Sequence, residues 1–282
     1  MNLNAFNTLD TASARKELFA CCGSTKWTDL MMSHFPFTSE KQLVDLSAKI
    51  WYDECDASDW RESFTHHPKI GDVKSLTEKF AGKEQAGVAV ATPETIQLLA
   101  KANSDYEAKN SFIFIVCATG KSADEMLALL LDRLQNTPEE ELYIAMGEQQ
   151  KISIIRFKKM LPNGDFSFLK VSQITTHVLD TSTGIPGASI SIRLQALRAG
   201  IWQTIAQGIT NNDGRIPDLL PQDKNLKPDT YKMVFDTGSY YGRTHIKTFY
   251  PKVEIIFSTF DETHYHVPLL VNPFGYSTYR GS

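Results

Sequence analysis

The 282-residue sequence has few cysteines, no long hydrophobic run and no strong charge of either sign. Its four cysteines, Cys21, Cys22, Cys55 and Cys117, have no CxxC spacing, which excludes the common zinc and redox motifs. They are typical of buried free thiols in a reducing compartment. With 29 basic and 33 acidic residues the net charge is −4, which argues against a broad surface for nucleic acid or anionic membrane.

No apolar segment approaches the roughly 18 residues that a membrane helix needs. The N-terminus also lacks the basic segment and apolar stretch of a secretory signal. Residues 170–178 nearly fit an internal peroxisomal signal, but the last position is not Leu or Ala and the segment overlaps an expected strand. The C-terminal RGS is not an SKL-type signal. We therefore expect a cytoplasmic protein without a nucleic-acid or membrane partner.

The first part of the chain is expected to be helical. Residues 43–50 place leucine and isoleucine at helical spacing, and residues 122–125 form a capping box before an apolar helical face. Thr-Pro pairs at 92–93 and 137–138 mark two further helix starts, because proline suits the first helical position. The last of these helices is expected to run to about Met160.

After Leu161 the pattern changes to that of strands and turns. This part holds 10 of the 16 glycines and 8 of the 12 prolines, which punctuate turns. Residues 189–194 alternate apolar and polar side chains, residues 231–235 and 253–257 are typical of further strands, and residues 211–214 indicate a turn.

Helices followed by strands, without alternation, predict two separate domains. We expect an all-α helical domain over residues 1–163 and an all-β domain over residues 170–282. The junction is expected at residues 162–165, where proline, asparagine and glycine follow one another.

Four polar residues stand out among the expected strands: His177, Arg215, His264 and His266. Taken singly, each is more often a structural or solvated residue than a catalytic one. His264 and His266 share one face of a strand, because strand side chains repeat every two residues. They could therefore bind a metal ion, as in a metal-dependent amidohydrolase.

Together these motifs are more specific. Four segments resemble the 5-hydroxyisourate hydrolases, the transthyretin-related family: ITTHVLDTSTGIPG, TNNDGR, FYPKVEIIF and HYHVPLLVNPFGYSTYRGS. The terminal YRGS separates these hydrolases from the hormone-carrying transthyretins. The resemblance implies a transthyretin-like β-sandwich of two four-stranded sheets and a homotetramer with active sites between subunits. By this pattern His177, Arg215, His266 and Tyr279 line the site.

The chemistry of these side chains suits that activity. Hydrolysis of a cyclic acyl–nitrogen bond needs a water molecule activated by a base with a pKa near neutrality, which imidazole supplies. A guanidinium offers a planar fork of donors for the ring carbonyls or the developing oxyanion. We expect His177 and His266 to position and deprotonate the water, Arg215 to orient the substrate, and His264 to support them without touching substrate. No metal or cofactor is expected.

The first part carries its own set of motifs. Four segments stand out, and each has a structural explanation: a loop (HHPKIGD), a solvated helix face (KEQAG), an apolar core segment (FIFIVCATGKSADEML) and a helix (EQQKISIIRFKKM). In this order they resemble the 2-oxo-4-hydroxy-4-carboxy-5-ureidoimidazoline (OHCU) decarboxylases, over roughly residues 5–160. That family is all-helical and uses no cofactor.

This resemblance implies a catalytic pair, His67 and Glu84. It also implies a set of substrate-binding residues: Pro68, Gln85, Phe114, Ile115, Val116, Cys117, Ala118 and Arg156. The sequence departs from the family at Ala81, where a serine is common, and the loss of that hydroxyl could weaken substrate positioning. Loss of CO2 leaves electrons that a neighbouring imine-like nitrogen can accept, so the enzyme must mainly deliver a proton to one face. His67 is the expected acid, with Glu84 orienting it and raising its pKa.

The two resemblances describe consecutive reactions. The second domain would convert 5-hydroxyisourate to OHCU, and the first would convert OHCU to (S)-allantoin, which predicts a bifunctional enzyme of urate degradation. The alternative is a transthyretin-like binding protein for a small ligand with a helical interaction module. The presence of His177, Arg215, His266 and the YRGS terminus favours the enzyme.

Overall fold

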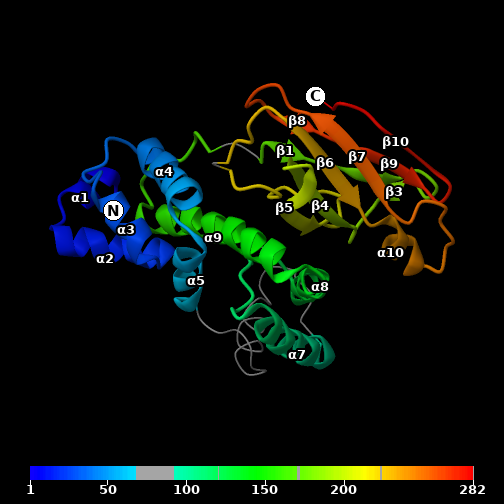
Figure 1. The fold of residues 1–282 in the computed structure, drawn as a ribbon, viewed down its shortest axis with the longest axis horizontal. Helices are drawn as coiled ribbons and strands as arrows, with labels where there is room; N and C mark the ends of the chain where they lie inside the picture. The colour runs from blue at the N-terminus through cyan, green and yellow to red at the C-terminus, as the bar shows by residue number, and fades with distance from the viewer. Residues whose placement is uncertain (68–91, 120, 170–171, 223, 282) are drawn as a thin grey trace. The chain divides into compact units, whose positions relative to one another are not determined.

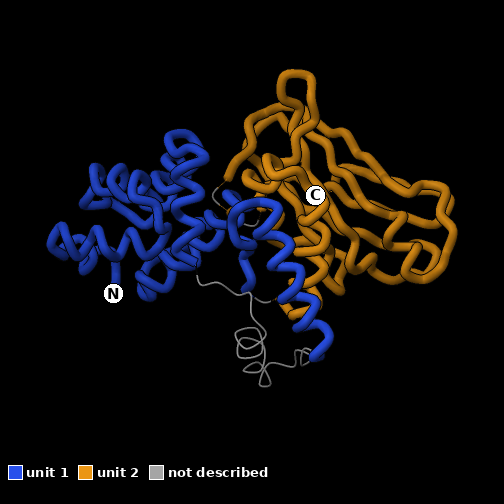
Figure 2. Tube along the Cα trace, turned by 60° about the horizontal axis from the view of Figure 1, so that its bottom comes forward, with its two compact units in different colours: residues 1–120, 145–170 blue, residues 121–144, 171–282 orange. Residues whose placement is uncertain are grey.

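The computed structural model describes residues 1–67, 92–119, 121–169, 172–222 and 224–281 (Figure 1). The chain forms two compact units, residues 1–120 with 145–170 and residues 121–144 with 171–282 (Figure 2). The domain limits of 1–163 and 170–282 stay a prediction. The predicted site residues Pro68, Glu84 and Gln85, and Ala81, lie outside the described residues. Among the helices that the structure describes, none is long and apolar enough to cross a membrane.

The first unit is helical, as predicted. Its helices in chain order are α1 (Leu3–Asn7), α2 (Thr11–Cys22), α3 (Thr25–Met32), α4 (Glu40–Lys49), the π-helical turn η1 (Ile50–Glu54), α5 (Ala57–Thr65), α7 (Pro93–Asn110) and the part of α9 (Pro138–Met160) from residue 145 onward. The predicted start of α7 is confirmed, because the Thr92 side chain accepts a hydrogen bond from the Thr95 N–H and caps the helix.

Large aromatic side chains hold α9 in the core of this unit. Trp27 and Trp51 are almost fully buried, and the indole N–H of Trp51 donates to the Met146 carbonyl at 3.0 Å. Trp27 stacks on Phe157 with ring centroids 6.2 Å apart. Such side chains bury much apolar area and still satisfy their one polar group. The helix is therefore anchored on both sides of the positions that face His67.

The apolar segment 112–118 is neither helix nor strand. Phe112, Ile115 and Cys117 are buried, which agrees with the expectation of a core segment. The Phe112 ring lies 5.1 Å from that of Phe64, and Tyr106 contacts Phe112 edge-on. Aromatic contacts thus fix an irregular stretch of backbone against α5 and α7.

The second unit contains a β-sandwich, as the resemblance implied. Its elements are α8 (Ala123–Arg133), β1 (Ile174–Thr175), β2 (Val178–Asp180), β3 (Ile185–Pro186), β4 (Ser191–Arg198), β5 (Ile201–Ile209), β6 (Thr230–Phe235), α10 (Thr237–Gly242), β7 (Val253–Ser258), β8 (Tyr265–His266), β9 (Leu269–Asn272) and β10 (Gly275–Thr278). The described strands form two four-stranded sheets, β10-β9-β2-β3 and β5-β4-β6-β7, and a parallel pair, β1-β8 (Figure 1).

The sandwich core follows the predicted alternation. Ile190, Ile192 and Leu194 have no exposed surface, and Met233 and Phe235 of the neighbouring strand are equally buried. Burying one such side chain stabilises the fold by about 1.5–3 kcal/mol. The strands predicted at residues 231–235 and 253–257 are confirmed as β6 and β7.

The outward face of β4 and β5 is polar and carries α8 of the same unit. Asp132 accepts hydrogen bonds from the Ser191 hydroxyl at 2.7 Å and from the Gln207 amide. The predicted capping box of this helix is confirmed, with Ser122 and Glu125 bonding to each other's backbone N–H groups. Hydrogen bonds therefore connect this helix to the sheet.

Candidate active sites

His67 lies just after the C-terminal end of α5, where the chain leaves the helix. His66 caps that end, and the His67 N–H donates to the Phe64 carbonyl at 3.3 Å. The half-buried imidazole reaches α9, where its Nε2 atom lies 2.5 Å from Oε1 of Gln149. A residue that follows a helix end is thus held by a side chain 82 positions further along the chain.

Helix α9 presents three polar side chains on one face, because Gln149, Ser153 and Arg156 are spaced four and three residues apart. Arg156 donates through Nη1 to the carbonyls of Ala20 and Cys21 at 3.3 and 3.2 Å. Burial lowers the pKa of its guanidinium from the usual value. The cation is therefore held beside His67 by the last turn of α2.

The pKa of His67 is lowered to about 4, first by burial and then by the positive charge of Arg156. The imidazole is consequently neutral at neutral pH. This differs from the expectation that a carboxylate raises the pKa of His67. Glu84, to which that role was assigned, lies outside the described residues.

The predicted binding segment lies close to a buried ion pair. The Cys117 N–H donates to Oε2 of Glu148 at 2.7 Å, and Lys151 bonds to the other oxygen of that carboxylate at 2.5 Å. Glu148 immediately precedes Gln149 on α9. The predicted binding segment and the His67 contact are therefore positioned by consecutive residues of one helix.

In the second unit, His177 and Arg215 are brought together by a tight turn. They form an isolated antiparallel bridge, and Nη2 of Arg215 lies 3.3 Å from Nδ1 of His177. Asn211 accepts hydrogen bonds from the Asp213 and Arg215 N–H groups, both at 3.0 Å. Gly214 adopts φ +70°, and a Cβ atom there would lie 2.4 Å from the Val178 carbonyl oxygen. Glycine at position 214 is therefore a structural requirement of this turn.

His264 and His266 contact one hydroxyl group. Oγ1 of Thr175 lies 2.8 Å from Nε2 of His264 and 2.9 Å from Nδ1 of His266. Thr175 and His266 are paired in the β1-β8 ladder, which sets this contact. The two imidazoles thus contact the same threonine. This agrees with the prediction that His264 and His266 lie on one face of the chain, because strand side chains repeat every two residues.

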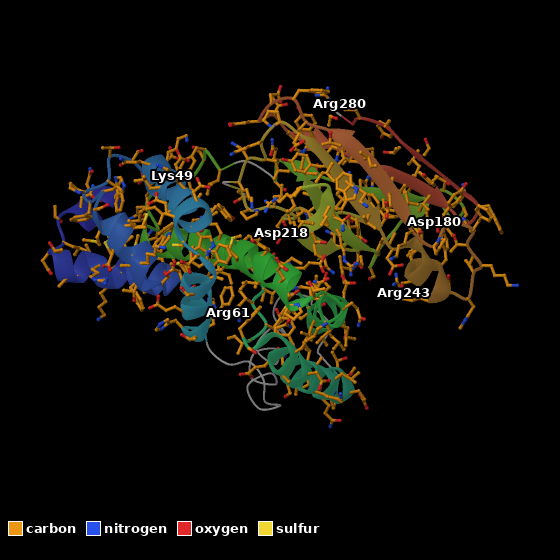
Figure 3. All side chains as sticks on the ribbon, in the orientation of Figure 1. Lys49, Arg61, Asp180, Asp218, Arg243 and Arg280 are labelled. Carbon is orange, nitrogen blue, oxygen red and sulfur yellow. The ribbon has the colours of Figure 1, made fainter. Side chains whose placement is uncertain are left out.

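The C-terminal segment lies against His266. Gly281 forms an isolated bridge with His266, with its N–H donating to the His266 carbonyl at 3.0 Å. Arg280 lies over the Tyr265 ring, 5.2 Å from the centroid, while Tyr279 is 58% exposed. In Figure 3, Arg280 lies at one end of the sandwich, and Asp180 lies toward α10 at the other.

The pKa values of His177 and His266 are both lowered from the ordinary value of 6.5. Burial is the largest cause in each case, and the charge of Arg215 is the next. His264 and His177 lower the pKa of His266 further. Both rings are therefore neutral at pH 7 and able to accept a proton.

Comparison with known proteins gives a consistent result. An OHCU decarboxylase family model matches residues 7–158, and a HIUase/transthyretin family model matches residues 174–281. A relative from Arabidopsis thaliana, uric acid degradation bifunctional protein TTL, is 32% identical over 93% of this chain and 96% of its own length. The chain belongs to this bifunctional family, an OHCU decarboxylase joined to a 5-hydroxyisourate hydrolase. It is a bifunctional enzyme of urate degradation rather than a transthyretin-like binding protein.

Of two further matches, one covers part of the chain and the other covers all of it. The 5-hydroxyisourate hydrolase of Mus musculus is 46% identical over 39% of the chain and 96% of that protein. A solved structure of (S)-allantoin synthase covers all of both chains at 24% identity with a TM-score of 0.46.

The structure brings together part of each predicted site. His177, Arg215 and His266 lie together in the hydrolase part, and His67 and Arg156 converge on the α9–α2 region of the decarboxylase part. Two further polar residues, Gln149 and Thr175, could not be identified from the sequence. Gln149 lies in the EQQKISIIRFKKM segment and Thr175 precedes His177 by two positions, but neither type of side chain carries a chemical signal of its own.

Proposed function

We propose that His177, Arg215 and His266 hydrolyse 5-hydroxyisourate to OHCU, and that His67 and Arg156 act in decarboxylation of OHCU to (S)-allantoin. The observation that carries this proposal is the grouping of neutral imidazoles beside a guanidinium in each part of the chain. A neutral imidazole can accept a proton, and a guanidinium can hold an oxygen-rich ring or an oxyanion.

In the hydrolase step a neutral imidazole, His177 or His266, removes a proton from water as the water oxygen attacks the ring carbonyl. The acyl–nitrogen bond then breaks, and the proton passes from the imidazolium to the leaving nitrogen. Arg215 donates to the substrate oxygens through its planar fork of N–H groups. Tyr279 is assigned to the same site, where its exposed side chain is available to substrate.

In the decarboxylase step the bond to the carboxylate carbon breaks and CO2 leaves. The electron pair moves toward the adjacent carbon–nitrogen double bond, whose nitrogen takes a proton, and an enol is formed. The enol then loses its hydroxyl proton and gains one at the ureido-bearing carbon, which gives allantoin. Because His67 is neutral at pH 7, it accepts the hydroxyl proton and returns a proton to one face of that carbon.

Arg156 binds the carboxylate or a carbonyl of OHCU in this proposal, since its guanidinium is half-buried beside His67. The backbone of residues 114–118 contacts the ureido group or the ring edge. Pro68, Glu84 and Gln85 keep the roles that the resemblance gave them: Glu84 is catalytic with His67, and Pro68 and Gln85 bind substrate. Neither reaction in this proposal uses a metal or a cofactor.

The hydrolase part is proposed to assemble as a homotetramer. Among the described strands, β7 and β10 each pair with a single neighbour, so each leaves an edge for pairing with another copy. Ile256 on β7 is 60% exposed and Tyr276 on β10 is 43% exposed. Sedimentation of the full chain should give the mass of four chains, and a single-chain mass at micromolar concentration would contradict the assembly.

We also propose a cytoplasmic location. All four cysteines are buried and none forms a disulfide, and burial raises the pKa of Cys21 and Cys55 to about 12. Cysteines without disulfides are typical of proteins in reducing compartments.

One experiment tests the two reactions together. Urate is supplied with urate oxidase and the full chain, and circular dichroism follows the chirality of the allantoin formed. We expect a single enantiomer, (S)-allantoin, formed faster than in the reaction without the chain. Racemic allantoin at the spontaneous rate would contradict the proposed function.

A further inference from the structure

We propose that Gln149 is a positioning residue for decarboxylation: its amide fixes the proton of His67 on Nε2 and leaves Nδ1 as the atom that exchanges a proton with substrate. This inference rests on the proposed catalytic role of His67. It adds a residue and a direction of proton transfer that neither the motifs nor the family resemblance supplied.

The contact itself is short. Oε1 of Gln149 lies 2.5 Å from Nε2 of His67, and the Gln149 side chain belongs to a fully buried residue on α9. A buried amide must satisfy both of its ends, because an unpaired polar group away from water destabilises the fold. The other end of the amide therefore decides how the contact with His67 is oriented.

Three hydrogen bonds set that orientation. The Gln149 amide nitrogen donates to the Cys22 carbonyl at 3.3 Å, and a carbonyl can only accept. It also donates to Oγ of Ser153 at 3.2 Å, whose own hydrogen is used toward the Cys21 carbonyl at 3.3 Å. With the nitrogen end committed to α2 and Ser153, the oxygen end must face His67.

An amide oxygen accepts and never donates, so Nε2 of His67 must carry the hydrogen. In the neutral ring the lone pair is then on Nδ1, the nitrogen that can take the hydroxyl proton of the enol. The same bond survives when the ring becomes cationic, because Nε2 still donates. Gln149 can therefore hold the ring in one orientation through both halves of a proton transfer.

The charges around His67 explain why an amide suits this position better than a carboxylate. Arg156 of α9 and the adjacent His66 both disfavour the cationic ring, and the thiols of Cys21 and Cys22 on α2 are neutral. A carboxylate at position 149 would favour imidazolium and leave Nδ1 protonated before substrate binds. The neutral amide orients the ring without changing its charge.

The adjacent residue offers a matched control. Gln150 lies on the same helix and is also buried, but its amide nitrogen donates to the Ser47 hydroxyl at 3.3 Å. Replacing either glutamine with leucine removes a buried amide from α9. Only the replacement at position 149 removes the contact with His67.

The test uses the full chain with Gln149→Leu, Gln149→Glu, Gln150→Leu and His67→Asn, and measures decarboxylase kcat and KM across pH with hydrolase activity as the folding control. We expect Gln149→Leu to lower kcat about tenfold to a hundredfold, as loss of orientation does, with KM within about threefold. Gln150→Leu should stay within about twofold of the unchanged protein. Gln149→Glu should move the acidic limb of the rate profile to higher pH, and NMR of 15N-labelled histidine should show His67 titrating at higher pH.

The outcomes separate this inference from the proposed function. If His67→Asn keeps decarboxylase activity while hydrolase activity is intact, the proposed role of His67 is wrong and the inference falls with it. If His67→Asn is inactive but both Gln149 variants keep the kcat and pH profile of the unchanged protein, only the inference is overturned. An equal loss of kcat in Gln149→Leu and Gln150→Leu would also overturn it, because both would then reflect helix packing.

Discussion

Gly281 lies so close to His266 that only glycine fits. A Cβ atom at Gly281 would be 2.4 Å from Cδ2 and 3.0 Å from Cγ of the imidazole. The Gly281 N–H donates to the His266 carbonyl, so the backbone cannot move away without losing that bond. The glycine of the terminal YRGS thus lets the end of the chain cover a face of the His266 ring.

Gly281→Ala should therefore displace the His266 ring. We expect hydrolase kcat/KM to fall about tenfold or more, because small misplacements of a reacting group are costly. Stopped-flow loss of freshly made 5-hydroxyisourate measures this. Gly242→Ala is the control, since no heavy atom lies within 4 Å of a Cβ at that position. Equal activity of the two variants would show that the contact with His266 has no role.

The hydrolase rate should depend on pH through His177 and His266. Both rings have a pKa below 6.5, chiefly because of burial, so the neutral, active rings persist above pH 6.5 and are lost as the pH falls below it. Arg215→Gln removes a charge that lowers both pKa values, so its acidic limb should lie at higher pH. A rate profile that is flat from about pH 5 to 8 would rule out imidazole as the base.

Arg215→Lys keeps the positive charge and loses the planar fork. Because Nη2 of Arg215 lies within 3.3 Å of His177, a lysine ammonium cannot contact both the ring and the substrate oxygens in the same way. We expect hydrolase kcat/KM to fall about tenfold or more, or about 1.4 kcal/mol. Arg243→Lys, an exposed change near α10, is the matched control and should leave the rate unchanged. Full activity of Arg215→Lys would show that hydrolysis does not need a bidentate contact from Arg215 to the substrate.

His67→Ala and Glu84→Ala should each abolish decarboxylation and leave hydroxyisourate hydrolysis within about twofold. His67 belongs to the helical unit, whereas the histidines assigned to hydrolysis belong to the sandwich unit. The two reactions are assayed separately, with His34→Ala as a control for an exposed histidine of the helical unit. If either variant stops the hydrolase step in a folded protein, the assignment of one reaction to each domain is wrong.

Residues 1–163 and 170–282 should each retain one activity when expressed apart. The second fragment lacks α8, but the strand residues that bond to Asp132 of α8, among them Ser191 and Gln207, are polar and can be solvated by water. Separation should therefore cost the sandwich little. The measurements are the two assays and the melting temperature of each fragment. An insoluble or inactive pair would contradict these domain limits.

The sequence predicted what depends on local pattern. The alternation of Ile190, Ile192 and Leu194 identified a core-facing strand, and the polar caps at Thr92 and Ser122 identified two helix starts to within a residue. These signals act within one element. They need no knowledge of what the element packs against.

Contacts across the fold could not be predicted in this way. Gln149 meets His67 only because the end of α5 approaches α9, and Thr175 meets His264 only through the β1-β8 ladder. The grouping of His177 with Arg215 came from family resemblance, since 38 residues separate them. The lowered pKa of His67 was also not foreseeable, because it results from burial and from a cation brought in by another helix.

The single hydroxyl hydrogen of Thr175 links the states of two histidines. If that hydrogen points to His264, Nδ1 of His266 must be the donor, and Nε2 of His266 then keeps a lone pair for water. If Nε2 of His264 carries a hydrogen instead, it donates to the threonine oxygen, and the hydroxyl hydrogen is free to turn toward Nδ1 of His266, whose neutral ring then carries its own hydrogen on Nε2. The tautomer of His264 thus helps to set which nitrogen of His266 keeps a lone pair.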